Sequence, residues 1–209
     1  MTTARPLLPR DARRAQILRA AAATFAIEGY AATSVEDVAR AAGITKLIVY
    51  RHFESKADLY RSILEETSER LAAEWAGAEE RASETGHNTA VETLLRVARD
   101  LPDGFRLLFV HAAREADFAQ FASDFRVLQL EVADARIGTL MAAGPRRVWL
   151  TGMIVDGIVD AVLGWMDVGD PADDDGWVAM ASESIRAMIT AAINSPTGGP
   201  ARRETPTRR

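Results

Sequence analysis

Apolar residues recur at helical spacing along almost the whole chain. Between residues 11 and 28, Ile17, Ala21 and Phe25 are four positions apart and therefore share one helix face. Between residues 34 and 42, the apolar side chains follow the i, i+3, i+4, i+7 pattern of a buried helical face. No segment alternates apolar and polar residues between turn residues, as a half-buried strand would. The pattern predicts an all-α fold of about nine helices.

Capping and turn residues mark where these helices begin and end. Gly29 and Gly43 stop the first two helices, while Ser34 (or Thr33), Thr45 and Ser55 are placed to cap the following ones. Segments 86–88, 102–104, 144–145 and 169–171 contain glycine or proline and separate the later helices. The predicted helices cover residues 11–28, 34–42, 45–52, 56–82, 89–101, 105–115, 118–141, 146–168 and 174–194.

The helices are expected to form two units. Residues 11–55 form a three-helix head after a flexible arm, 1–10, and residues 56–194 form a helical body. The last segment, 195–209, lacks apolar residues able to dock and is expected to be a disordered tail.

The charges are distributed unevenly between these units. The net charge of −5 argues against a nucleic-acid partner only if it is spread over the whole chain. Residues 1–61 carry 10 Lys and Arg against 6 Asp and Glu, whereas residues 62–194 carry 11 against 23. A basic head on an acidic body is expected when one end of a protein meets DNA phosphates.

Several other classes of protein are disfavoured by composition. The absence of cysteine excludes disulfides and thiol chemistry and fits the reducing cytoplasm. The apolar run 148–166 approaches membrane-spanning length, but Asp156 and Asp160 lie within it, so we expect a buried helix and no membrane partner. The acidic run 173–175 suits a helix N-terminus better than a cation site. No phosphate-binding loop or nucleophile motif is present, and we expect no enzyme activity, metal or cofactor.

A helix, a short turn with Gly43 and a second short helix have the sequence form of a helix-turn-helix. Val49 and Phe53, four residues apart, are expected to point into the head. Thr45, Lys46, Tyr50 and part of Arg51 are then left on the opposite face. A lysine there can reach guanine O6 and N7 or a phosphate, and a tyrosine can contact a phosphate or a thymine methyl.

Residues 13–60 resemble the N-terminal signature of the TetR/AcrR family of transcriptional regulators. The glycines, caps, aromatic pair and lysine occur in register, in the order Gly29-Tyr30, Thr33 to Ala39, Ala42 to Thr45, Val49 to Phe53, Ser55-Lys56 and Leu59. The resemblance and the outward face together give the expected DNA contacts: Ser34, Thr45, Lys46, Leu47, Tyr50, Arg51, His52 and Lys56. Tyr50 and His52 have packing within the head as an alternative. Leu47 and Ile48 depart from the usual small or polar residues, which suggests contacts with thymine methyls.

The last two helices are rich in small residues that allow close helix packing. The resemblance implies that they form a four-helix dimer interface, for which Gly157, Ala161, Gly164, Ile185 and Met188 are the candidates; an internal core is the alternative. The resemblance also implies an effector cavity in the body. Its candidate residues are Phe105, Phe109, Arg114, Phe118, Phe121, Phe125, Trp149 and Met153, each of which has the core or the surface as an alternative.

The resulting hypothesis is a cytoplasmic, homodimeric DNA-binding regulator. It is expected to repress from a palindromic double-stranded operator and to be released by an apolar or amphipathic small-molecule effector. The alternatives are a helical ligand-binding or interaction protein without DNA binding and, with less support, an enzyme.

Overall fold

The computed structural model describes residues 9–85 and 89–195, without the side chains of 79–85 and 89. In this part of the chain there are nine α-helices and no strand, which confirms the predicted fold class. The helices are α1 (Arg10–Glu28), α2 (Val35–Ala41), α3 (Lys46–Tyr50), α4 (Lys56–Thr85), α5 (Thr89–Asp100), α6 (Pro102–Arg106), α7 (Ala119–Ile137), α8 (Pro145–Val168) and α9 (Asp174–Asn194). The predicted break at Gly86-His87-Asn88, the arm up to residue 8 and the tail from residue 196 lie outside the described residues.

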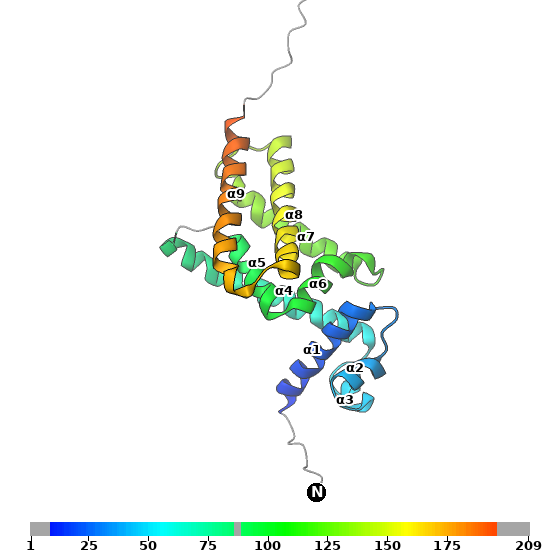
Figure 1. Cartoon of the computed structure of the whole chain (residues 1–209). Helices are drawn as coiled ribbons and strands as arrows, with labels where there is room; N and C mark the ends of the chain where they lie inside the picture. Colours follow the sequence, from blue (N-terminus) through cyan, green and yellow to red (C-terminus); the bar gives the residue numbers. More distant parts are fainter. Residues whose placement is uncertain (1–8, 86–88, 196–209) are drawn as a thin grey trace, which may run out of the picture.

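Helices α1, α2 and α3 form a small unit at one end of the molecule (Figure 1). The side chains that repeat along α1, Ile17, Ala21 and Phe25, are fully buried against Val38 of α2 and Val49 of α3. Helices α2 and α3, of 7 and 5 residues, are too short to be stable alone, so this shared core holds the unit together. The observed helix bounds differ from the predicted ones by a few residues.

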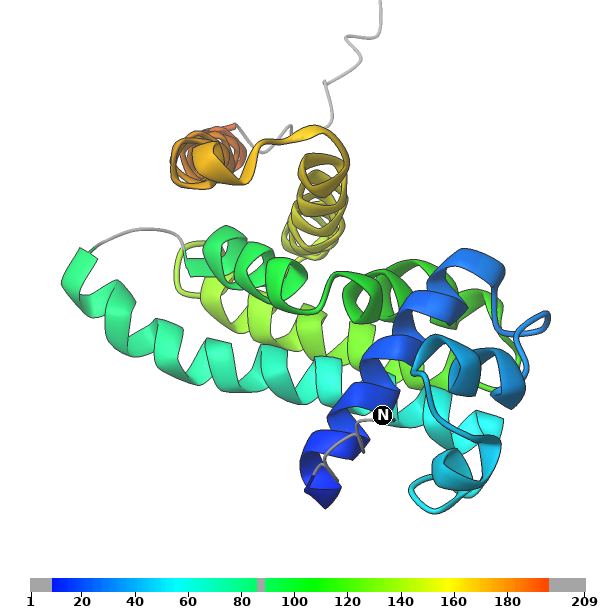
Figure 2. The same ribbon diagram turned by 60° about the horizontal axis from the view of Figure 1, so that its bottom comes forward.

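The long helix α4 leaves the head and runs along the body, where it packs against α5 (Figure 2). Helix α8 packs on both α5 and α7, while α9 contacts α5 and α8. In Figure 2, α8 and α9 are seen almost end-on as a pair beside the layer of α4, α5 and α7. The pair therefore forms one outer side of the body.

The segment predicted as a single helix over 105–115 is the main error in the helix assignment. Its first turn begins at Pro102, which occupies the N1 position, where its missing N–H is no loss. After Arg106 the backbone changes to a π-helix over Leu107–His111 and then to a 3₁₀ turn over Ala112–Arg114. The prediction failed because Pro102 and Gly104 lie inside a helix rather than between helices. In addition, apolar periodicity alone does not distinguish α-, π- and 3₁₀-helices.

Helix α8 was predicted to be buried, and within one protomer that prediction is wrong. Only 28% of its most apolar window is buried, and it is the one helix in the described residues that passes a length and hydropathy test for a membrane span. A single such helix is weak support for a span, because core helices of soluble proteins pass the same test. The remainder of its apolar surface is exposed in the single chain.

Candidate nucleic-acid interface

The turn between α2 and α3 is a Schellman motif centred on Gly43. Gly43 has φ +65°, the left-handed conformation that glycine adopts at little cost. The N–H of Ile44 donates to the carbonyl of Ala39 at 2.9 Å, and the N–H of Gly43 donates to Arg40 at 3.1 Å. These two bonds define the motif and satisfy carbonyls at the end of α2. The turn thus sets the angle at which α3 leaves α2.

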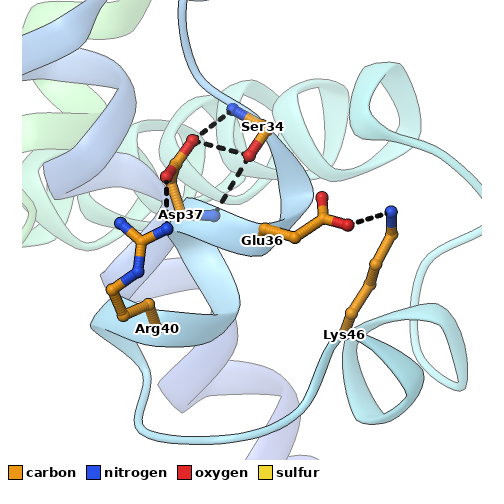
Figure 3. A network of polar contacts seen from close by, with 5 residues as sticks. All are labelled: Ser34, Glu36, Asp37, Arg40 and Lys46. Atoms are coloured by element: carbon orange, nitrogen blue, oxygen red, sulfur yellow. Dashed lines mark hydrogen bonds and ion pairs between the residues drawn. The ribbon is translucent and has the colours of Figure 1, made fainter.

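A capping box fixes the other end of α2 (Figure 3). The Ser34 N–H donates to Asp37 Oδ2 at 2.9 Å, and the Asp37 N–H donates to Ser34 Oγ at 3.2 Å. The Ser34 hydroxyl also donates to Asp37 Oδ2 at 2.6 Å, and this bond lowers the pKa of Asp37, as do, to a smaller extent, the bond from the Ser34 N–H and the nearby Arg40. Ser34, a predicted DNA contact, therefore already has a structural role as the N-cap.

The orientation predicted for α3 is confirmed. Val49 and Phe53 are buried, whereas Leu47 and Tyr50 are 64% and 44% exposed. Lys46, Thr45 and Arg51 are exposed on the same short helix or at its ends. Thr45 is the N-cap by position, but its side chain makes no capping hydrogen bond. The outward face of α3 thus presents Lys46, the Tyr50 phenol and the apolar Leu47 side chain to any partner, with Arg51 at its end.

Lys46 is held between two neighbours. Its ammonium donates to the Glu36 carboxylate of α2 (Figure 3). It also lies 5.6 Å from the centre of the Tyr50 ring. The hydrogen bond with Lys46 lowers the pKa of Glu36, and the same bond raises the pKa of Lys46. Both groups are therefore charged at neutral pH. Sequence reasoning missed Glu36, because a contact across ten residues and a turn has no local signal.

Two other predicted DNA contacts, Lys56 and His52, are partly buried in the head. The Lys56 ammonium donates to the carbonyls of Tyr30 at 2.8 Å and Thr33 at 3.0 Å, and it lies 4.3 Å from the Tyr30 ring centre. Lys56 therefore closes the α1–α2 loop, and one of its three donor hydrogens is left for a phosphate.

His52 is half-buried. Burial lowers its pKa, and the nearby Arg10, Arg13 and Arg14 lower it further. The imidazole is thus mostly neutral at pH 7, and the surrounding arginines supply the positive charge on this side of α3.

The small residues predicted for a dimer interface lie on the outer side of α8. Gly157, Ala161 and Gly164 are exposed, and a Cβ built on Gly157 or Gly164 would meet no atom within 4 Å. A larger side chain at Gly157 or Gly164 would therefore start into open space in the single chain. Ile185 and Met188 of α9 are half-buried and pack on the core.

The body contains a cavity of about 630 Å³. Side chains from α4, α5, α7, α8 and α9 line it, and most of them are apolar, with Ser68, Glu69, Gln129 and Arg136 as polar exceptions. The Arg136 guanidinium lies 5.0 Å from the ring centre of Trp75, which also lines the cavity. Apolar walls with a few polar groups are typical of small-molecule sites.

Of the eight residues predicted for this cavity, only Phe125 lines it. Arg114 and Trp149 are exposed, the latter by 63%. Phe109, Phe121 and Met153 are partly buried against the core, while Phe105 and Phe118 are core residues. Periodicity identified apolar positions but not which helix faces enclose empty space.

Phe118 lies instead at the joint between head and body. Its ring centre is 5.1 Å from that of Tyr30 in the head and 4.4 Å from that of Tyr60 in α4. Tyr60 is also 5.1 Å from Phe25 of α1. Close ring pairs of this kind add to the burial of each ring, so the joint is a packed core rather than a loose hinge.

Comparisons with known proteins agree with this geometry. Residues 17–63 match the family model described as bacterial regulatory proteins, tetR family. The chain is 30% identical over 183 residues to the HTH-type transcriptional activator FasR of Mycolicibacterium smegmatis. The aligned region covers 82% of this chain and 80% of FasR.

Solved structures share the fold over most of their length. A TetR-like transcriptional regulator from Rhodococcus sp. RHA1 superposes with a TM-score of 0.68 at 22% identity, over 88% of this chain and 99% of that one. The regulator FadR from Bacillus subtilis, in complex with stearoyl-CoA, superposes with a TM-score of 0.57 at 18% identity, over 86% and 97% of the two chains.

Proposed function

Since the chain belongs to the TetR family and is a DNA-binding transcriptional regulator, not an enzyme, we propose that it acts as a cytoplasmic homodimer on a palindromic operator. We further propose that an apolar or amphipathic small molecule in the body controls its affinity for that operator.

The outward face of α3 carries the first part of this proposal. In a helix-turn-helix, the N-terminal residues of the second helix contact base edges in the major groove. Lys46, Leu47 and Tyr50 are exposed there, while Val49 and Phe53 anchor the helix to the head. Lys46 is suited to guanine, and Leu47 is suited to a thymine methyl.

The outer side of α8 and α9 supports a dimer. Val168 on α8 and Met180 on α9 are 86% and 61% exposed, and Gly157 and Gly164 share a face of α8 with Val168 because they lie 11 and 4 residues before it. A second copy that packs on this side would cover these apolar groups and bring the small residues of the two chains together. Two heads joined in this way can read half-sites about one helical turn of DNA apart.

The cavity supports an effector with a substantial apolar part. Its volume lies within the range of about 300 to 1,000 Å³ that is typical of small-molecule sites. The stearoyl-CoA of the Bacillus subtilis FadR structure is an amphipathic molecule of this kind, held by a protein of the same fold.

Helix α4 connects the two sites. Leu71, Ala72 and Trp75 near its middle line the cavity, while its first residue, Lys56, holds the α1–α2 loop of the head. A ligand that favours another position of α4 therefore also favours another position of the head. Where that position no longer matches the operator half-sites, linkage requires that DNA and ligand weaken each other's binding by the same factor. Couplings of this kind are typically about 1 to 3 kcal/mol.

Repression is the proposed default, because a regulator bound over a promoter excludes the polymerase. FasR is named an activator, which favours activation as the second candidate. A reporter gene fused to the operator separates the two, since deletion of the regulator raises expression in the first case and lowers it in the second.

The central experiment is selection of a duplex from a randomised library, followed by titration with the purified protein at several salt concentrations. We expect a palindromic site whose affinity falls steeply with salt. The double variant Lys46→Ala/Tyr50→Ala should lose this binding but keep its fold and its dimer. A wild-type protein with no salt-sensitive affinity for any selected duplex would refute the proposal.

A further inference from the structure

Glu36 places a carboxylate on the DNA-facing side of the head. It lies in the first turn of α2, is exposed, and hydrogen-bonds the Lys46 ammonium of α3 (Figure 3). Lys46 is the first residue of the recognition helix, where base edges are contacted. Because the two side chains touch, the carboxylate also lies where base edges are read.

The fold of the head depends little on the contact between Glu36 and Lys46. The neighbouring Asp37 already supplies the capping box of α2 and pairs with Arg40 at 2.9 Å. The Gly43 turn and the buried Val49 and Phe53 hold α3 against the head. Glu36 and Lys46 are each about half exposed, at 54% and 45%, and such exposed ion pairs contribute little to stability.

A carboxylate at this position discriminates between partners. It is repelled by phosphates, so it weakens binding to DNA of arbitrary sequence. In the major groove it accepts hydrogen bonds only from exocyclic amines, and the cytosine N4 amine is the one it commonly pairs with. Lys46, with donor hydrogens left after the bond to Glu36, has guanine O6 and N7 as its preferred acceptors.

We propose that Glu36 and Lys46 read one G·C base pair of each operator half-site as a unit, Lys46 by donating to guanine and Glu36 by accepting from the N4 amine of the paired cytosine. This inference rests on the proposed DNA-binding function of the head. The contact between the side chains sets the ammonium and the carboxylate side by side, as the acceptors and the donor lie side by side on the edge of that base pair. Glu36 is then a specificity-determining residue contributed by the first helix of the motif.

The test compares the wild-type protein with Glu36→Ala, Lys46→Ala and the double variant on the selected duplex. At one G·C pair of each half-site, Glu36→Ala should lose roughly fivefold to a hundredfold discrimination against the other base pairs. Replacement of that cytosine by 2-pyrimidinone, which lacks the N4 amine, should weaken the wild type but not Glu36→Ala. Replacement of the guanine by 7-deazaguanine should likewise affect the wild type more than Lys46→Ala. The double variant should show less than the combined loss, because the two residues act on one base pair.

Glu65→Ala is the matched control, since it removes an exposed carboxylate from α4 and should leave every base preference unchanged. The same analogues placed outside the half-sites control for weakened pairing, and thermal melts confirm that each variant folds. An unchanged base preference in Glu36→Ala, with only a uniform change of affinity, would overturn the inference while leaving the proposed function intact. Selection of an A·T pair at the Glu36-dependent position would also overturn it. A wild type that selects no duplex would overturn the proposed function itself.

Discussion

Gly157→Leu separates folding of the protomer from formation of the dimer. Gly157 lies on the outer side of α8, and no atom lies within 4 Å of the position that its Cβ would take. The Cβ of a leucine there therefore meets nothing within one chain. The leucine should stabilise the helix by about 0.5 to 1 kcal/mol, because glycine is a poor helix former.

In the proposed dimer the same leucine has no room. Overpacking of a close interface costs about 1 to 3 kcal/mol for each added side chain, and two-fold symmetry adds two of them. The dimer should therefore lose about 2 to 6 kcal/mol, which weakens association by about 30-fold at the least.

Sedimentation velocity over a range of concentrations measures the association, and thermal unfolding of the dilute protein measures the stability of the protomer. Ala73→Leu, at an exposed position of α4, adds the same side chain away from α8 and should change neither the dimer nor the fold. If Gly157→Leu dimerises as tightly as the wild type, this side of α8 is not the interface. A lower thermal stability of the protomer would show that the leucine clashes within one chain, and so that the space around Gly157 is not open.

Three further predictions concern the head and the cavity. Gly43→Ala places a side chain at φ +65° and should destabilise the head by about 1 to 2 kcal/mol, visible as a lower melting temperature; an unchanged melt would contradict the Schellman turn. The pKa of His52 is lower in the folded protein than its ordinary value of 6.5, so just below pH 6.5 the unfolded chain binds more protons than the folded one. The free energy of unfolding should therefore fall as the pH falls through this range, and denaturant titrations should show a smaller loss for His52→Gln. Ala72→Trp should fill part of the cavity and abolish the response to an effector while operator affinity is kept, which gel-shift titrations with and without the effector would measure.

The sequence by itself determined the features that depend on near neighbours in the chain. The N-cap at Ser34, the turn at Gly43 and the inward pair Val49 and Phe53 all arise from contacts within four or five residues. The outward face of α3 follows from that pair, because a helix that buries one side must expose the other. The fold class followed in the same way from periodicity over many turns.

Only the tertiary structure decided which distant groups meet. Lys56, a predicted DNA contact, proved also to donate to carbonyls of the preceding loop, and Glu36 proved to be the partner of Lys46. Apolar residues such as Phe118 and Trp149 look alike in the sequence, yet one is packed in the joint between head and body and the other is exposed. The empty volume of the cavity depends on how five helices are spaced around it. The exposure of α8 depends on how much of its surface the other described helices cover. Periodicity specifies which face of a helix is apolar, whereas the position of that face relative to the other helices is a property of the packed chain alone.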